Sequence, residues 1–321
     1  MYVLREVSAP PIDDTWRVVY SGLDFWGKEI FLLAPAGADL AAVEPEVGSR
    51  KPPTGRGMAV WRDGQLVPLP DLPQVADTAD HGPQGYVFAS RAVGVESDDG
   101  TAESAENVWF ADGDGKVFRG ISVGSQFSHL AMDDEGALWV GYRDQAGLWV
   151  PPPAAGRPDL ADGVLLPGVC RWSPEGHLSW VLSRDAGVAE PGFHCYSLNV
   201  SAAGRLAAVD WRNSVVELAV SGESRFWATE NQSPSGLAKR GDDLLLLGRY
   251  EWPKRRGDQP AGFDVVSRHH LTGAGLELSE ESRLVLPDGS ALPGVPQGVS
   301  AKGDLVLMHF GDVSRPSVLS L

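Results

Sequence analysis

The chain has 321 residues and a mass of 34.3 kDa, and 43% of its residues are hydrophobic, which is enough for a large core. Its formal net charge is -16 and its isoelectric point is near 4.8. Because an acidic surface repels phosphate groups, these values predict that it binds neither nucleic acid nor an anionic membrane surface. Two cysteines, Cys170 and Cys195, are too few for a disulfide framework, and we expect both to be buried.

No segment has the properties of a membrane span or of a secretory signal. No run approaches eighteen apolar residues, and the first residues carry charge early and lack an apolar segment. We therefore expect a cytoplasmic protein without a membrane span. The sequence leaves the oligomeric state open, with a monomer favoured.

Short strand-like runs separated by polar turns follow one another along the chain, and no stretch has a helical period of apolar residues. The runs fall into groups of four, with a shorter last group. The predicted strands are 16–20, 29–33, 57–61 and 65–69; about 75–81, 86–93, 107–110 and 116–121; 127–132, 137–142, 168–173 and 177–182; 194–200, 205–210, 215–220 and 224–229; 236–239, 243–249, 263–270 and 277–286; and 299–300, 304–309 and 317–321.

Five glycine-ended turns recur at a nearly even spacing. Their glycines, at positions 64, 115, 176, 222 and 275, are separated by 51, 61, 46 and 53 residues. A period near fifty residues, with strands on both sides of each turn, is typical of a β-propeller whose repeat is a four-stranded antiparallel blade. The sequence therefore predicts an all-β protein with one propeller domain over residues 1–321.

The last group of strands is one strand short, which would leave an unpaired sheet edge. The segment at about 2–7 alternates in the manner of a strand and precedes the first blade. We expect it to supply the missing outer strand and to close the ring. The predicted count is six blades, with seven as the second choice.

The predicted connections between the second and third strands of each blade are long, whereas the other hairpin turns are short. Long loops on one rigid face are a usual place for binding and catalysis. Polar residues recur where the second strands end and where the inner strands begin, so we expect them to surround an axial funnel. The candidate ligand-binding residues are Gln126, Arg143, Asp144, Tyr196, Asp210, Trp211, Arg212, Arg249, Tyr250, Glu251, Trp252 and Asp312.

Histidines in the same predicted funnel suggest two further kinds of chemistry. His129, His194 and His309 are candidates for a catalytic base. Together with Asp144 and Asp210 they are also residue types that ligate a divalent metal, and ligands in a propeller can come from separate blades. The alternative for each of them is a structural role, hydrogen-bonded to the loop backbone.

One segment resembles the blade motif of sensor-type and NHL-like propellers. Residues 133–141 read DDEGALWVG and are followed by Gly147, Leu148 and Trp149. Six-bladed relatives with this plan include gluconolactonases, which use a divalent metal, and strictosidine-synthase-like proteins. Their acidic and asparagine metal ligands have no match in this chain, so the resemblance implies a fold and not an activity. The chain as a whole is similar to bacterial propellers that have no assigned chemistry.

These observations predict a soluble propeller that binds a small molecule or a peptide in its axial funnel. One alternative is a metal-assisted hydrolase, lyase or isomerase that uses the same funnel. A second alternative is a protein-interaction scaffold that uses the rim of the propeller.

Overall fold

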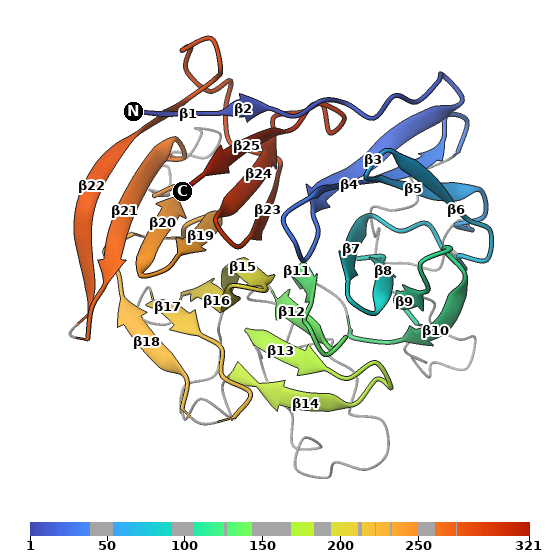
Figure 1. Ribbon diagram of the computed structural model, residues 1–321, viewed down its shortest axis with the longest axis horizontal. Helices are drawn as coiled ribbons and strands as arrows, with labels where there is room; N and C mark the ends of the chain where they lie inside the picture. Colours follow the sequence, from blue (N-terminus) through green and yellow to red (C-terminus); the bar gives the residue numbers. More distant parts are fainter. Residues whose placement is uncertain are drawn as a thin grey trace.

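The computed structural model describes residues 1–38, 54–91, 106–124, 127–142, 168–182, 194–210, 214–221, 223–231, 233–249, 261–273 and 275–321. Every regular element assigned in these ranges is a β-strand, and the strands form a ring of antiparallel sheets (Figure 1). The all-β propeller prediction is confirmed. Within the same ranges, no helix is long and apolar enough to cross a membrane.

The described strands group into six four-stranded units around the ring, each numbered from the axis outward. The units are β3 (Trp16–Leu23), β4 (Glu29–Pro35), β5 (Met58–Arg62) and β6 (Gln65–Leu69); β7 (Thr78–Gly82), β8 (Gly85–Ala89), β9 (Val108–Ala111) and β10 (Val117–Ile121); β11 (Phe127–Met132), β12 (Leu138–Tyr142), β13 (Val169–Trp172) and β14 (Leu178–Val181); β15 (Cys195–Ser201), β16 (Gly204–Val209), β17 (Ser214–Glu217) and β18 (Arg225–Ala228); β19 (Gly236–Arg240), β20 (Asp243–Leu247), β21 (Val265–Leu271) and β22 (Leu276–Val285); and β23 (Gly298–Lys302), β24 (Leu305–His309) and β25 (Ser317–Ser320) with β2 (Arg5–Glu6).

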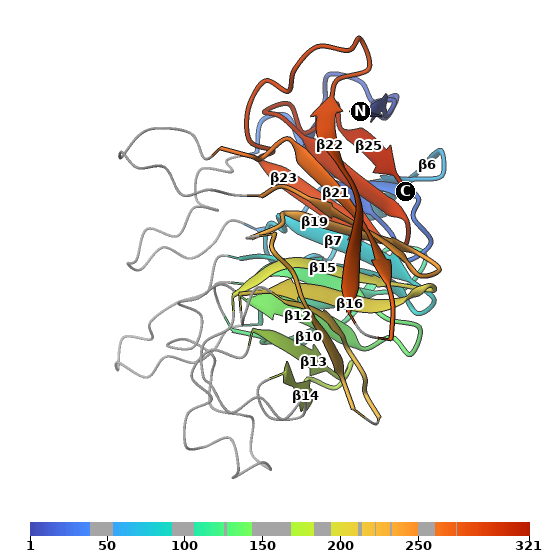
Figure 2. The same ribbon diagram turned by 90° about the vertical axis from the view of Figure 1, so that its left-hand side faces the viewer.

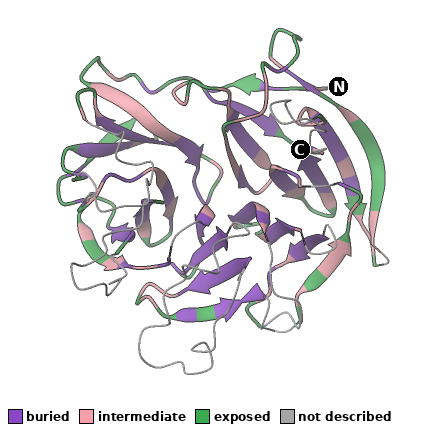
Figure 3. Ribbon diagram, turned by 180° about the vertical axis from the view of Figure 1, so that it is seen from behind, coloured by how far each residue is buried: buried purple, intermediate pink, exposed green. Residues whose placement is uncertain are grey.

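Apolar residues are buried between neighbouring units, as the colouring of Figure 3 shows for the second and third strands. The described residues form six buried apolar clusters, and each cluster joins two neighbouring units. The cluster that contains Leu23, Phe31, Leu307 and Val318 joins the last unit to the first. The ring is thus closed by hydrophobic contact as well as by strand pairing.

Four of the glycine-ended turns, at Gly64, Gly115, Gly176 and Gly275, lie between the third and fourth strands of their units, and Gly222 lies outside the described residues. Gly64, Gly115 and Gly176 have φ angles of 77°, 81° and 84°, a region that residues with a Cβ atom rarely adopt. The turn after β11 combines a glycine with a side-chain cap: Gly136 has a φ angle of 79°, and Asp133 Oδ1 accepts hydrogen bonds from the backbone N–H groups of Glu135 and Ala137, at 3.0 and 2.9 Å.

The N-terminal segment closes the ring, but it contacts two units rather than one. As predicted, β2 pairs antiparallel with β25, with Arg5 opposite Val318. The two residues of β1 (Tyr2–Val3) instead pair in parallel with the end of β22 in the preceding unit. Leu4 lies between these short strands and is only 2% exposed, so its burial between the fifth and sixth units accounts for the division.

Candidate functional site

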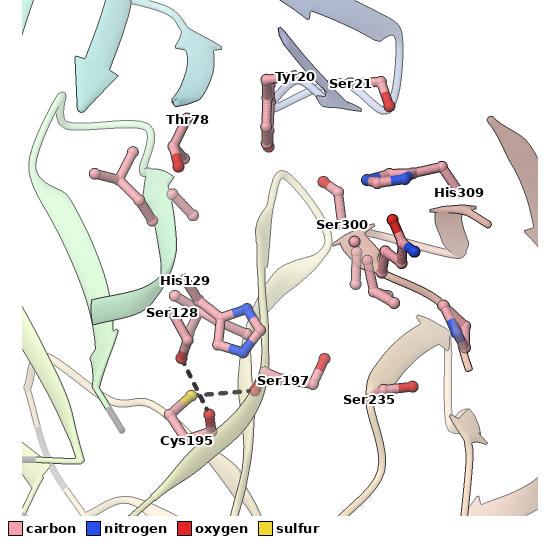
Figure 4. A pocket seen from close by; sticks show the side chains of 18 of the residues that line it. Tyr20, Ser21, Thr78, Ser128, His129, Cys195, Ser197, Ser235, Ser300 and His309 are labelled. Carbon is pink, nitrogen blue, oxygen red and sulfur yellow. Dashed lines mark hydrogen bonds between the residues drawn. The ribbon is translucent and has the colours of Figure 1, made fainter. Parts of the chain in front are cut away.

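A cavity of about 560 Å³ lies on the axis, lined by the inner strands of five units and by Ser233 and Ser235, which precede the inner strand β19 of the fifth unit. Its lining reaches residues that precede β7, β19 and β23, and none of the short turns that follow the inner strands contributes. It is therefore placed toward the face that carries the predicted long connections. We call it the axial cavity; its lining includes Tyr20, Ser21, Thr78, Ser128, His129, His194, Tyr196, Ser197, Ser235, Ser300, Lys302 and His309 (Figure 4).

Four of the residues proposed from the sequence meet in this cavity. His129, His194 and Tyr196 come from the beginnings of β11 and β15, and His309 ends β24. The rings of His194 and Tyr196 stack, with centroids 4.6 Å apart and an interplanar angle of 28°. The carbonyl oxygen of Tyr196 accepts a hydrogen bond from His129 Nε2 at 3.1 Å. These contacts fix the orientation of the rings on one side of the cavity.

His309 is on the other side of the cavity, and its ring packs over Gly298. A Cβ atom at position 298 would lie 2.2 Å from His309 Nε2, so only glycine leaves room for the imidazole. Burial lowers the pKa of His309, and this outweighs the opposing effect of Asp312. The imidazole is therefore neutral near pH 7, and its buried Nδ1 has no hydrogen-bond partner among the described residues.

Hydroxyl groups supply most of the other polar atoms of the axial cavity. Ser128 Oγ donates to the carbonyl oxygens of Gly141 and Cys195, at 3.3 and 3.4 Å. Ser300 Oγ accepts from the N–H group of Leu23 at 3.0 Å, whereas Ser21 Oγ is buried and has no partner in the described part of the chain.

Three further candidates lie outside the cavity lining because local contacts direct them elsewhere. Asp210 Oδ1 accepts from the backbone N–H of His194 at 2.8 Å and so supports the start of β15. Arg249 lies 3.7 Å from Glu281 at the outer strand of its unit. Asp312 Oδ1 accepts from the backbone N–H of Ser314 at 2.9 Å, within its own turn.

The remaining ligand-binding candidates fall outside the described residues. They are Gln126, Arg143, Asp144, Trp211, Arg212, Tyr250, Glu251 and Trp252. Among the residues that the structure describes, no three His, Cys, Asp or Glu side chains are grouped so that they could hold a metal ion. The metal candidates His129, His194, His309 and Asp210 are thus not gathered into one ligand set.

The cavity ends in a layer of buried polar groups that sequence analysis missed. Lys302 Nζ donates to Asp80 Oδ2 at 2.6 Å, and the two side chains are 4% and 1% exposed. Asp80 also accepts from the backbone N–H groups of Met132 and His81, each at 2.8 Å. Burial raises the pKa of Asp80, whereas the Lys302 ammonium and the two N–H groups favour its ionised form.

Asn199 completes this layer. Its Nδ2 donates to the carbonyl oxygens of Leu237 and Gly303, and its Oδ1 accepts from the N–H of Gly303, all at 2.8 Å. Asn199 also pairs in parallel with Ala301, which joins the inner strands of two units that are not neighbours in the ring. We call Asp80, Asn199 and Lys302 the closed end of the axis.

Some of the missed residues carry a weak sequence signal. Ser128, Ser197 and Ser300 are small polar residues within inner strands that are otherwise mainly apolar. Lys302 and Asp80 lie in inner strands as well, but 222 residues apart in the chain. Nothing in the local sequence indicates that they meet, because their contact depends on how the ring closes.

Comparison with known proteins does not assign the chain to a family. No family model matches the chain, and no curated protein matches it. Solved structures with similar folds include the Neurospora crassa Pan2 WD40 domain, at 10% identity and a TM-score of 0.46 over 99% of this chain and 94% of that one. A catalytically inactive virginiamycin B lyase from Staphylococcus aureus with quinupristin has 12% identity and a TM-score of 0.43, covering 100% of both chains.

A third similar structure, YCF48 bound to D1 peptide, has 10% identity and a TM-score of 0.42 over 98% of this chain and 100% of that one. Similarities at this level do not bear on ligands or activity. The propeller assignment rests on the strand pairing of the chain itself.

Proposed function

We propose that the protein binds a small, uncharged, hydrogen-bonding molecule in the axial cavity. The observation that supports this best is the cavity itself, about 560 Å³ in volume and lined by residues that every unit contributes. Its volume falls in the range of small-molecule pockets, and it combines apolar walls with a few convergent polar groups.

The charges of the described lining support an uncharged ligand. Lys302 is paired with Asp80, and Arg91 Nε lies 3.2 Å from Asp77 Oδ2. His309 is neutral near pH 7 because burial lowers its pKa. What the lining then offers is hydroxyl groups and imidazole nitrogens, which can donate to or accept from a neutral polar molecule.

The unpartnered atoms indicate where such a ligand would form hydrogen bonds. Ser21 Oγ and His309 Nδ1 are buried without a partner in the described residues, and buried polar atoms are rarely left unsatisfied. A ligand that reaches either atom, directly or through a water molecule, would recover a hydrogen bond that the protein alone does not make.

Native mass spectrometry, followed by a thermal-shift screen with neutral polyols, short peptides and organic acids, tests this proposal. Any molecule found is then titrated by calorimetry into the wild type and into two variants. Ser235→Trp fills the cavity, and Ser221→Trp places the same side chain at an exposed turn as the control. We expect the dissociation constant to rise at least about tenfold only in Ser235→Trp. An unchanged dissociation constant in Ser235→Trp would refute the axial location.

The same mass spectra separate this proposal from the metal-assisted enzyme. A mass surplus that fits a divalent ion and disappears on chelation would favour the metal-assisted alternative. A surplus that fits an organic molecule would favour the binding function and would name the ligand class.

A further inference from the structure

The outer strand of the fifth unit differs from the outer strands of the others. β22 spans ten residues, whereas β6 and β10 have five each and β14 and β18 have four each. Five consecutive residues of β22, 277–281, are exposed. In the side view of Figure 2, β22 faces the viewer as the long outer strand of its unit.

Most of the outer edge of β22 has no strand partner. On its inner side it pairs with β21 from Leu276 to Arg283. On its outer side β1 pairs only with Leu284 and Val285, and no other described strand pairs with the preceding eight residues. An edge of this kind presents backbone N–H and C=O groups that another extended chain can use.

Three of the eight residues along this free edge are glutamates, and its one basic residue, Arg283, pairs with Asp264. Glu277 lies opposite His270, and Glu280 lies opposite Arg268, so the two glutamates share one face of the sheet. Glu281 is on the other face, 3.7 Å from the guanidinium of Arg249. Leu278 adds an apolar side chain that is 57% exposed.

These charges decide between the strands that could pair there. A second copy of β22 would bring glutamates close to glutamates, and like charges across a strand pair are destabilising. An extended segment with lysine or arginine at alternating positions would instead place opposite charges beside Glu277 and Glu280 on one face and beside Glu281 on the other. The pairing already made by β1 shows that this edge accepts an added parallel strand.

We propose that residues 276–283 form a docking edge for an extended, basic segment of a partner protein, which adds to the sheet as a strand next to β1. The site is on the rim of the ring and is separate from the axial cavity. Docking there leaves the cavity accessible.

The test uses a blocked octapeptide of alternating threonine and lysine, titrated by calorimetry, with amide hydrogen exchange to locate the contact. We expect slower exchange within 276–283 and binding that weakens with salt. A peptide of the same sequence with every backbone nitrogen methylated keeps its charge but has no backbone N–H on either edge and cannot pair as a strand, so we expect it not to bind. An octapeptide of alternating threonine and glutamate is the charge control.

Two triple variants that remove the same number of charges test whether the glutamates of this edge attract the lysine peptide. Glu277→Gln, Glu280→Gln and Glu281→Gln together should weaken lysine-peptide binding roughly tenfold or more. Asp71→Asn, Glu223→Gln and Glu230→Gln remove the same charge at exposed positions elsewhere. This second triple variant should bind the lysine peptide with nearly unchanged affinity.

Three outcomes would overturn the proposal. The first is that the methylated peptide binds as tightly as the unmethylated one. The second is that both triple variants lose the same affinity for the lysine peptide. Either result would mean that the peptide is attracted to the acidic protein in general and not to this edge. The third is a dimer in sedimentation that dissociates in a Leu278→Pro variant, which would assign the edge to a second copy of the chain.

Discussion

The two ends of the axis differ in how completely their buried polar groups are hydrogen-bonded. At the closed end, Asp80, Asn199 and Lys302 are almost fully buried, and each makes hydrogen bonds that join different units. In the axial cavity, Ser21 Oγ and His309 Nδ1 are buried without described partners. Satisfied groups hold the inner strands together, whereas unsatisfied ones are available to a ligand. Under the proposed function, the groups that stabilise the propeller and those that bind the ligand would lie at different ends of its axis.

The largest expected effect comes from Lys302→Met at the closed end. The change keeps most of the side-chain volume but leaves the Asp80 carboxylate buried without its cation, which should lower the free energy of unfolding by about 3–5 kcal/mol. Urea denaturation measures the loss. Adding Asp80→Asn should recover part of it.

Lys28→Met is the matched control, because Lys28 pairs with Asp63 at 2.8 Å on the surface, where both side chains are well exposed. We expect it to cost less than about 1 kcal/mol. Equal losses in Lys28→Met and Lys302→Met would contradict the role given to the closed end.

The next effect is a pH dependence of stability centred on His81, which lies in β7 next to Asp80. Burial, aided by the nearby Arg62 charge, lowers the pKa of His81 from 6.5 to about 4. Between these values the unfolded chain binds a proton that the folded chain does not. Stability is therefore greatest above pH 6.5 and should fall by on the order of 2–3 kcal/mol as the pH drops to 4.

Urea denaturation at several pH values measures how steeply the free energy of unfolding changes with pH. The slope should become flatter in His81→Gln and stay unchanged in His177→Gln, which replaces an exposed histidine. An unchanged slope in His81→Gln would show that other groups cause the acid sensitivity.

Gly141→Ala tests the packing beside the cavity. A Cβ atom at position 141 would lie 2.7 Å from Cys195 Sγ, so the inner strands would have to shift, at about 1–3 kcal/mol. Thermal unfolding measures the cost, and Cys195→Ala in the same background should reduce it. Gly113→Ala meets no atom within 4 Å and serves as the control. If both glycine variants unfold alike, close packing at position 141 is not the cause.

The smallest effect on stability is expected for Arg91→Ala in the lining. Its pair with Asp77 is partly exposed, so its loss should change the free energy of unfolding by less than about 1 kcal/mol. An uncharged ligand should keep its affinity in this variant. A clear loss of affinity would show that the ligand is anionic, which would correct the proposed ligand class.

Most of the fold could be predicted from the sequence, because each blade is a local pattern. The predicted strands 137–142 and 243–249 each contain a continuous apolar run, and the structure buries these runs between units within β12 (Leu138–Tyr142) and β20 (Asp243–Leu247). The glycine turns set the repeat. The sequence does not predict that the N-terminal segment pairs with two units, because this depends on the burial of Leu4 between the fifth and sixth units.

The candidate site was predicted less completely. His129, His194 and Tyr196 are predicted to be axial because they lie where inner strands begin, and His309 because it ends a second strand; all four line the cavity. Asp210, Arg249 and Asp312 looked equivalent in sequence but are held by neighbours outside the lining. Strand-end position alone does not specify where a side chain points.

The sequence by itself determined the all-β repeat, the order of the strands and the acidic character of the chain, since these depend on local patterns and composition. Only the tertiary structure decided the polar contacts at the axis, the length of free edge on β22 and the shape of the cavity. The physical reason is sequence separation: Asp80 and Lys302 meet only when the ring closes, and no local pattern encodes that closure.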